Sequence, residues 1–121
     1  MGLKRYCVKE QYTIKEVLEQ FESYNDRVAI VTNDSNKVIG VVSQGDILRA
    51  LSAGQNLYTP VNQIIKESFL HLYEKDMEKA YPIFKKKQIS LLPIVNQNSE
   101  LIDFITIDDI YDYLEKKWDG A

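Results

Sequence analysis

A segment of this chain is repeated at a fixed offset of 63 residues. The run from Gly40 to Ile47 returns as the run from Asp103 to Ile110, with a hydroxyl residue and a carboxylate in register in both copies. The offset also holds towards the N-terminus without a gap, and the matched pairs there are Val31 and Ile94, Asn33 and Asn96, Val38 and Leu101, Ile14 and Met77, and Phe21 and Phe84. Two halves that agree in pattern and spacing are expected to fold into the same supersecondary unit.

The composition limits the chain to a small globular fold. Its 121 residues, 45% of them hydrophobic, suit one compact domain or two halves that share a core. The net charge of −3 gives no broad basic surface, so nucleic acid is not the expected partner. A single cysteine, Cys7, cannot form an internal disulfide, which favours a reducing, cytoplasmic location. We recognise no membrane-spanning apolar run and no signal peptide. The sequence leaves open whether this is a whole small protein or the excised domain of a larger one.

Each half is predicted to run strand, helix, strand, strand, helix, which gives an α/β (α+β) fold. In the first half, Thr13 and Glu16 have the spacing of a capping box, and apolar residues follow at helical intervals. Two strands, 28–31 and 37–42, flank a polar turn, and Ser43 has the character of a helix N-cap. Gly54 is expected to end that helix.

The second half is predicted to repeat this scheme after a short helix that follows Pro60 and runs to Ile65. We expect strands near 69–72, at 91–95 and at 101–105, and helices from Asp76 and from Thr106. Pro82 should kink or shorten the helix in which it falls, and Pro93 should make its strand an edge strand or a bulged one. The predicted division is a first repeat at 1–58, a linker at 59–68 and a second repeat at 69–121.

These motifs resemble those of the cystathionine-β-synthase (CBS) domain family, and the two copies resemble the tandem pair called a Bateman module. The resemblance covers roughly residues 6–114. The family signature Gly–apolar–x–Ser/Thr–x–x–Asp–apolar is complete in the first half, whereas Asp103 replaces its glycine in the second. A narrower resemblance, from Gly45 to Ile64, is to the CBS pair that precedes some sugar-phosphate nucleotidyltransferase domains.

The resemblance implies two pseudo-twofold halves whose clefts can hold an adenosine nucleotide of the AMP, ADP or ATP class. Asp46 and Asp109 would accept hydrogen bonds from ribose hydroxyls, and Ser43 and Thr106 would favour a phosphate at helix N-termini. The adenine edge would be read by backbone groups near Tyr12 and, in the second half, near Lys75. Arg27 is the most plausible phosphate cation, and Arg49 and Lys66 are weaker candidates.

The same Ser–x–x–Asp and Thr–x–x–Asp motifs are also simple capping boxes, which stabilise a helix start by about 1 kcal/mol whether or not a ligand binds. The first motif is the better ligand candidate, because Asp103, Asp108, Asp109 and Asp112 crowd negative charge around the second.

Three classes of function remain. The leading hypothesis is a non-catalytic regulatory module that binds a nucleotide and biases an attached or partner enzyme. The alternative is a ligand-free dimerisation or assembly module, such as the accessory domain of a nucleotidyltransferase. Apolar stripes on two helices would then form a homodimer, with Ile47, Leu48 and Leu51 on one helix and Ile110, Tyr111 and Leu114 on the other. An enzyme is disfavoured because the sequence has no P-loop and no Ser/His/Asp set. No metal site is predicted, since His71 has no second His or Cys partner in a ligand spacing.

Overall fold

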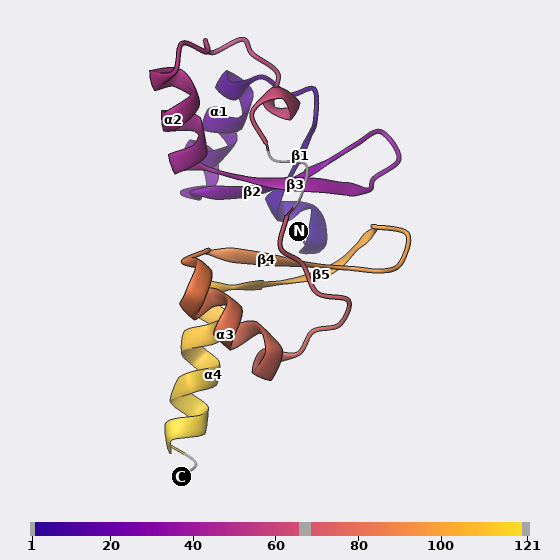
Figure 1. Cartoon of the computed structure of the whole chain (residues 1–121), viewed down its shortest axis with the longest axis vertical. Helices are drawn as coiled ribbons and strands as arrows, with labels where there is room; N and C mark the ends of the chain where they lie inside the picture. Colours follow the sequence, from indigo (N-terminus) through magenta and orange to yellow (C-terminus); the bar gives the residue numbers. More distant parts are fainter. Residues whose placement is uncertain (1, 66–68, 120–121) are drawn as a thin grey trace. The chain divides into compact units, whose positions relative to one another are not determined.

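The computed structural model describes residues 2–65 and 69–119, which fall into two compact units, Met1–Phe69 and Leu70–Ala121 (Figure 1). Each unit is a small sheet with two helices on one of its faces. The mixed α/β architecture confirms the predicted fold class.

The first unit contains a three-stranded sheet in the order β1-β2-β3. β1 pairs with β2 in parallel, and β2 pairs with β3 antiparallel. In chain order, its elements are β1 (Cys7–Lys9), α1 (Ile14–Tyr24), β2 (Val28–Thr32), β3 (Val38–Ser43) and α2 (Gln44–Ser52). Short 3-10 helices cover Gly2–Tyr6 and Val61–Gln63, so the helix expected after Pro60 forms but is a single 3-10 turn.

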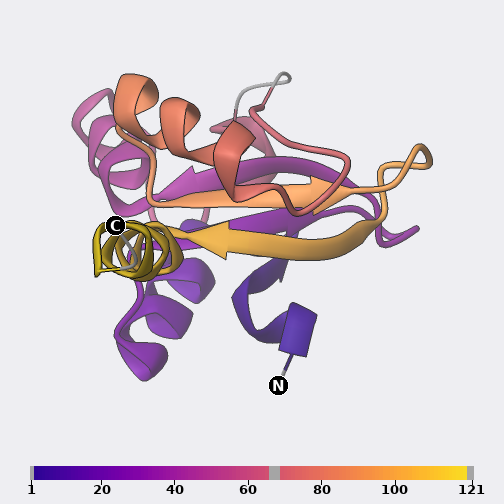
Figure 2. The ribbon, with the colours of Figure 1, turned by 90° about the horizontal axis from the view of Figure 1, so that it is seen from below.

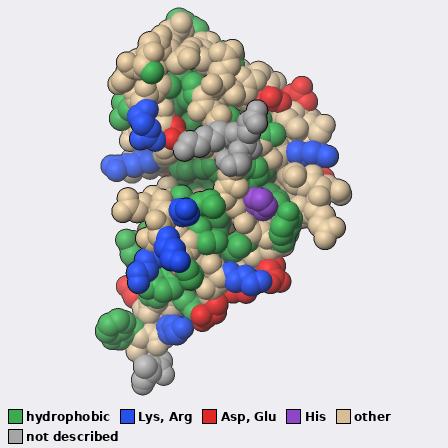
Figure 3. All heavy atoms as spheres, viewed as in Figure 1, with side chains coloured by type: hydrophobic (Ala, Val, Ile, Leu, Met, Phe, Trp, Pro, Cys, Tyr) green, Lys and Arg blue, Asp and Glu red, His purple; other side chains and the backbone are tan. Residues whose placement is uncertain are grey.

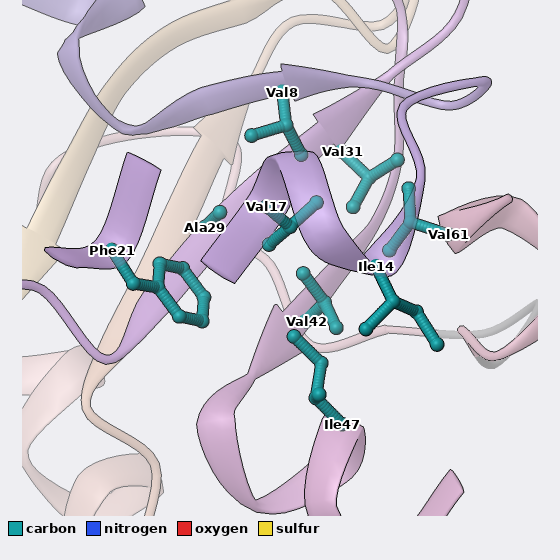
Figure 4. Close-up of a cluster of buried hydrophobic side chains, with 9 residues drawn as sticks. All are labelled: Val8, Ile14, Val17, Phe21, Ala29, Val31, Val42, Ile47 and Val61. Carbon is teal, nitrogen blue, oxygen red and sulfur yellow. The ribbon is translucent and has the colours of Figure 1, made fainter. Parts of the chain in front are cut away.

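Local signals define α1 at both ends. The Thr13 side chain accepts a hydrogen bond from the Glu16 N–H, and the Glu16 carboxylate accepts one from the Thr13 N–H at 2.9 Å, which confirms the capping box. Asn25 ends the helix in the left-handed conformation, with φ 57°. The apolar face of α1 packs on the sheet in a cluster of nine buried side chains (Figure 4), which are Val8, Ile14, Val17, Phe21, Ala29, Val31, Val42, Ile47 and Val61.

The second unit contains α3 (Met77–Lys87), β4 (Leu91–Val95), β5 (Leu101–Thr106) and α4 (Ile107–Asp119). β4 and β5 form an antiparallel pair whose hairpin projects beyond the helices (Figure 2). A second buried cluster lies under the helices and consists of Ala80, Phe84, Leu92, Ile94, Ile105 and Ile110. Glu78 of α3 accepts hydrogen bonds from Tyr113 and Lys117 of α4, which links the two helices at their exposed sides.

Positive side chains gather over α3 in the view of Figure 3. Lys85, Lys86 and Lys87 occupy the last turn of this helix. Cations at that end complement the partial negative charge of the helix C-terminus, so the run has a structural explanation.

The backbone repeats in detail at the offset of 63 residues. The described non-glycine residues with positive φ form two pairs at this offset, Asn25 with Gln88 and Asn36 with Ser99. The register shifts between Val31 and Thr32 in one unit and between Ile94 and Val95 in the other, again at this offset. The repeat therefore specifies caps, turns and bulges as well as the order of elements.

The prediction of a strand near 69–72 is wrong, because within this segment only Leu72 forms a β-bridge, which pairs it with Ile94. Leu72 donates its N–H to the Pro93 carbonyl and accepts a hydrogen bond from the Val95 N–H. The next parallel bond towards the N-terminus would need an N–H on Pro93, which proline lacks. In the first unit, by contrast, Val8 pairs with Val31, the counterpart of Ile94.

The two prolines of the second unit have different outcomes. The expectation for Pro93 is confirmed, because β4 belongs to a two-stranded sheet and its register shifts one residue later. Pro82 was expected to kink or shorten its helix, and the helix is not shortened, because α3 has 11 residues, as does α1. Its buried residues, Ala80 and Phe84, lie on either side of Pro82 and hold the helix on the sheet.

Candidate functional site

The first motif lies where β3 ends and α2 begins. Ser43 is the last residue of β3 and the N-cap of α2. Its hydroxyl accepts a hydrogen bond from the Asp46 N–H at 3.1 Å, and its own N–H donates to Asp46 Oδ2 at 2.9 Å. Both residues are half-buried, so the hydroxyl and the carboxylate are fixed at the edge of the unit with some surface open.

Arg49 adds a cation to this pair. Its Nη2 lies 2.7 Å from Asp46 Oδ1, so each carboxylate oxygen of Asp46 already accepts one hydrogen bond. A Cβ added at Gly45 would lie 3.4 Å from Arg49 Nη1 and 3.7 Å from Ser43 Oγ. The guanidinium and the hydroxyl therefore lie on the same side of the first turn of α2, over a residue that has no side chain.

The electrostatics of the site favour an ionised Asp46. Burial raises the pKa of this carboxyl, but hydrogen bonds from the Ser43 N–H, the Arg49 guanidinium and the Ser43 hydroxyl, together with the charge of Arg49, outweigh burial. The net effect is a pKa below the ordinary value for aspartate. Asp46 is therefore a charged acceptor at neutral pH, as binding to ribose hydroxyls would require.

The structure places Arg27 next to the motif, whereas Tyr12 is already engaged elsewhere. The Arg27 carbonyl accepts a hydrogen bond from the Gln44 N–H at 2.8 Å, which puts this exposed residue beside the N-terminus of α2. The Tyr12 N–H donates to the Lys9 carbonyl, and the Tyr12 carbonyl accepts from the Val61 N–H at 2.7 Å. Only the second lone pair of that carbonyl remains for a base edge. Lys66 lies outside the described residues.

The second motif repeats the hydrogen bonds of the first but not its surroundings. Thr106 ends β5, its N–H donates to Asp109 Oδ2 at 2.8 Å, and its hydroxyl accepts from the Asp109 N–H at 3.2 Å. Lys75, where an adenine edge was expected, has its ammonium 3.7 Å from Asp103 Oδ1. An ion pair in the second unit thus stands where the first unit has Tyr12 and Gly40.

The largest difference between the motifs is charge. Around the first lie two arginines and two glycines, and at the same offset around the second lie one serine and three aspartates. The pairs are Arg27 and Ser90, Gly40 and Asp103, Gly45 and Asp108, and Arg49 and Asp112. These substitutions add positive charge around the first motif and negative charge around the second.

Sequence reasoning missed the ion pair of Asp46 with Arg49, although an Asp–Arg spacing of three residues on a helix is a recognisable signal. It also placed Ile47 and Ile110 on apolar stripes available to a partner, and this is wrong. Both are buried in the core of their own unit. Leu48 and Tyr111, their neighbours, are 60% and 58% exposed and correspond to each other at the offset of 63.

Among residues 2–65 and 69–119, no group of three or more His, Cys, Asp or Glu side chains is arranged to hold a metal ion. Within these same residues, no helix has the length and apolar character needed to span a bilayer.

The chain consists of two repeated units, and in each unit a hydroxyl–x–x–carboxylate motif begins the helix that follows the last strand. This arrangement is typical of proteins built from two tandem copies of one small domain. The model of the CBS domain matches the chain twice, at residues 4–53 and 61–116. The chain therefore belongs to the CBS domain family, and it carries a tandem pair of these domains.

Known relatives extend this assignment. An uncharacterized 17.7 kDa protein of Acidianus ambivalens is 26% identical over 108 residues, which cover 88% of this chain and 65% of that protein. The chain spans less than two thirds of the length of this relative and of the next two curated relatives, where the shares are 43% and 52%.

Two solved structures show similar folds with adenosine compounds bound. A CBS domain protein from Pyrobaculum aerophilum complexed with AMP has a TM-score of 0.75 and 25% identity, covering 91% of this chain and 90% of that one. The CBS domain pair of protein MJ0100, in complex with 5-methylthioadenosine and S-adenosylmethionine, has a TM-score of 0.76 and 17% identity, with 89% of each chain covered.

Proposed function

We propose that this chain is a non-catalytic regulatory module that binds an adenosine nucleotide and biases an attached or partner enzyme. The observation that carries the proposal is the Ser43–Asp46 pair at the start of α2, flanked by Arg27 and Arg49, in a chain of the CBS family. The complexes of similar folds with AMP and with adenosyl compounds support the ligand class.

In this proposal, each residue around the first motif contacts a different part of the ligand. Asp46 accepts the ribose hydroxyls, because an ionised carboxylate offers only acceptors. The Ser43 hydroxyl and the N-terminal end of α2 contact the phosphate, and Arg27 neutralises it. Tyr12 borders the adenine. Thr106 and Asp109 form the equivalent but weaker site, in which the surrounding carboxylates oppose a phosphate.

Regulation would follow from linkage. A ligand that binds one arrangement of the two repeats, 1–58 and 69–121 with the linker 59–68, stabilises that arrangement at the expense of others. An enzyme connected to the repeats would sense the shift. A ligand-free assembly module is the second candidate, and the exposed pair Leu48 and Tyr111 favours it.

Thermal unfolding in the presence of AMP, ADP, ATP, adenosine and S-adenosylmethionine tests the proposal. A ligand at a hundred times its dissociation constant adds about 2.7 kcal/mol to the unfolding free energy, which is several degrees for a domain of this size. Asp46→Ala should remove most of the shift, and the matched Asp109→Ala should remove less. The unliganded variants must be melted as well, because each substitution also removes a capping carboxylate. If no adenosine compound shifts the melt at millimolar concentration, the assembly module replaces this proposal.

A further inference from the structure

The side chain of Arg49 is much more exposed than that of the carboxylate it pairs with. It is 74% exposed, whereas the side chain of its partner Asp46 is 34% exposed. An ion pair between such solvent-exposed groups is weak, and the long side chain of Arg49 can change its rotamer at a small cost in free energy. Arg49 can therefore exchange one anionic partner for another.

The guanidinium can reach one anionic partner in the structure and one position where an anion of a ligand would lie. The partner is Asp46 Oδ1, at 2.7 Å from Nη2. The position is that of any anion held by the Ser43 hydroxyl, because that hydroxyl and Arg49 Nη1 both lie within 3.7 Å of the same point beside Gly45. A ribose on Asp46 would compete with Arg49 for Oδ1, and a phosphate near Ser43 would give Arg49 a replacement for it.

The second unit provides a natural comparison in the same fold. Asp112 stands in place of Arg49, and Asp108 stands in place of Gly45. The hydrogen bonds between Thr106 and Asp109 are nevertheless kept, at 2.8 and 3.2 Å. The capping box therefore needs neither the arginine nor the glycine, and a structural role in helix capping does not explain them.

We propose that Arg49 determines ligand specificity at the first motif by transferring from Asp46 to the ligand phosphate, so that a phosphorylated adenosine is selected over adenosine and over S-adenosylmethionine. This inference rests on the proposed function, and it identifies Arg49 as the residue that determines which class of adenosine compound binds. An uncharged nucleoside displaces Arg49 without offering it a new partner. A sulfonium nucleoside places a positive charge beside the guanidinium, which repels it.

The test measures the dissociation constants of AMP, adenosine and S-adenosylmethionine by calorimetry on the whole chain, with the Gly45 amide NMR signal as the local reporter of the first motif. Arg49→Gln should weaken AMP binding about fivefold, the effect of losing one exposed ion pair, and leave adenosine unchanged or bound slightly more tightly. Arg49→Lys keeps the charge and should retain most of the preference for AMP.

Lys37→Gln is the matched control. It removes one positive charge from an exposed position just before β3, roughly 20 Å along this strand from Ser43. The ratio of AMP to adenosine affinity should not change in this variant beyond twofold.

Each outcome separates this inference from the function on which it rests. A ratio that falls in Arg49→Gln and holds in Lys37→Gln supports the partner exchange. Equal loss of AMP and adenosine binding in Arg49→Gln, or an unchanged ratio, overturns the inference while nucleotide binding stands. Wild-type protein that prefers S-adenosylmethionine to AMP also overturns it. If the wild-type chain binds none of the three, the proposed function fails and the inference fails with it.

Discussion

Asp46 performs two tasks with one carboxylate. It accepts the Ser43 N–H and so caps α2, and it is also the acceptor that we assign to a ribose. Asp109 has the same capping bond but lies among aspartates instead of arginines. At the scale of single residues, the two repeats thus differ in the side chains around a shared capping box and not in the box itself.

Removal of Arg49 should raise the pKa of Asp46. This pKa lies below the ordinary value because the hydrogen bonds from Ser43 and Arg49 outweigh burial. A depressed carboxylate pKa adds stability that is present above the unfolded value, about 3.9, and is lost as the pH falls through the folded value. The free energy of unfolding of the Arg49→Gln variant should therefore depend less on pH in this acidic range than that of the wild-type protein. NMR titration of the Asp46 carboxyl carbon in both proteins measures the shift, and an unchanged pKa would show that the ion pair does not form in solution.

The sequence predicted the helix starts because each depends on residues three positions apart. Thr13 with Glu16, and Ser43 with Asp46, satisfy each other locally, so pattern alone is sufficient. The role of Arg49 was harder to predict, because an exposed arginine has several partners within reach and the sequence does not rank them. The contacts of the Tyr12 backbone could not be predicted, because its carbonyl accepts a hydrogen bond from Val61, a residue 49 positions away in the sequence.

At the scale of elements, α1 and α3 are equivalent 11-residue helices at the offset of 63 residues, and α3 has a proline in its interior. Pro82 occupies the sixth position of α3, and Glu19 occupies the same position of α1. Proline there cannot donate to the carbonyl of Glu78, four residues earlier. The helix forms because buried Ala80 and Phe84 contribute more than the lost hydrogen bond costs.

Replacement of Pro82 by alanine should stabilise the second unit. Alanine restores the N–H and has a helix propensity roughly 3 kcal/mol better than proline, less the greater flexibility of the unfolded chain, so about 1–2 kcal/mol is expected. The matched substitution Glu19→Pro in α1 should destabilise the first unit by about 3 kcal/mol. Urea unfolding of both variants gives these free energies. A destabilised Pro82→Ala protein would contradict the argument and indicate that the proline ring itself packs.

The strand missing near 69–72 shows where pattern reasoning stops at this scale. Its sequence has the apolar character of a strand, but its hydrogen bonds depend on a partner far along the chain. Pro93 withholds the N–H that the next bond would use, and the register moves so that Leu72 takes the place of Val8. The strand propensity of a segment depends on its own sequence, whereas the hydrogen bonds of a strand depend also on the sequence of the strand with which it pairs.

At the scale of the whole molecule, each unit buries one cluster of side chains under two helices and also has exposed apolar side chains. Leu48 on α2 and Tyr111 on α4 are exposed and equivalent at the offset of 63 residues. Their neighbours Ile47 and Ile110 are buried in the two cores. A repeat that places an apolar side chain outside twice, at the same position of the same helix, is suited to a contact with a second copy of the chain.

We therefore expect a homodimer that depends on Leu48 and Tyr111. The double variant Leu48→Glu, Tyr111→Glu places four carboxylates at the contact of two chains and should shift the mass measured by light scattering from about 28 kDa, twice the 14.1 kDa chain, to that of the chain alone. Leu57→Glu is the control, because it also adds a charge at an exposed leucine but lies outside the α-helices. Since neither Leu48 nor Tyr111 belongs to a buried core, the double variant should keep its far-UV circular dichroism. A wild-type chain that remains monomeric at high micromolar concentration would exclude this contact, and a variant that stays dimeric would place the interface on other residues.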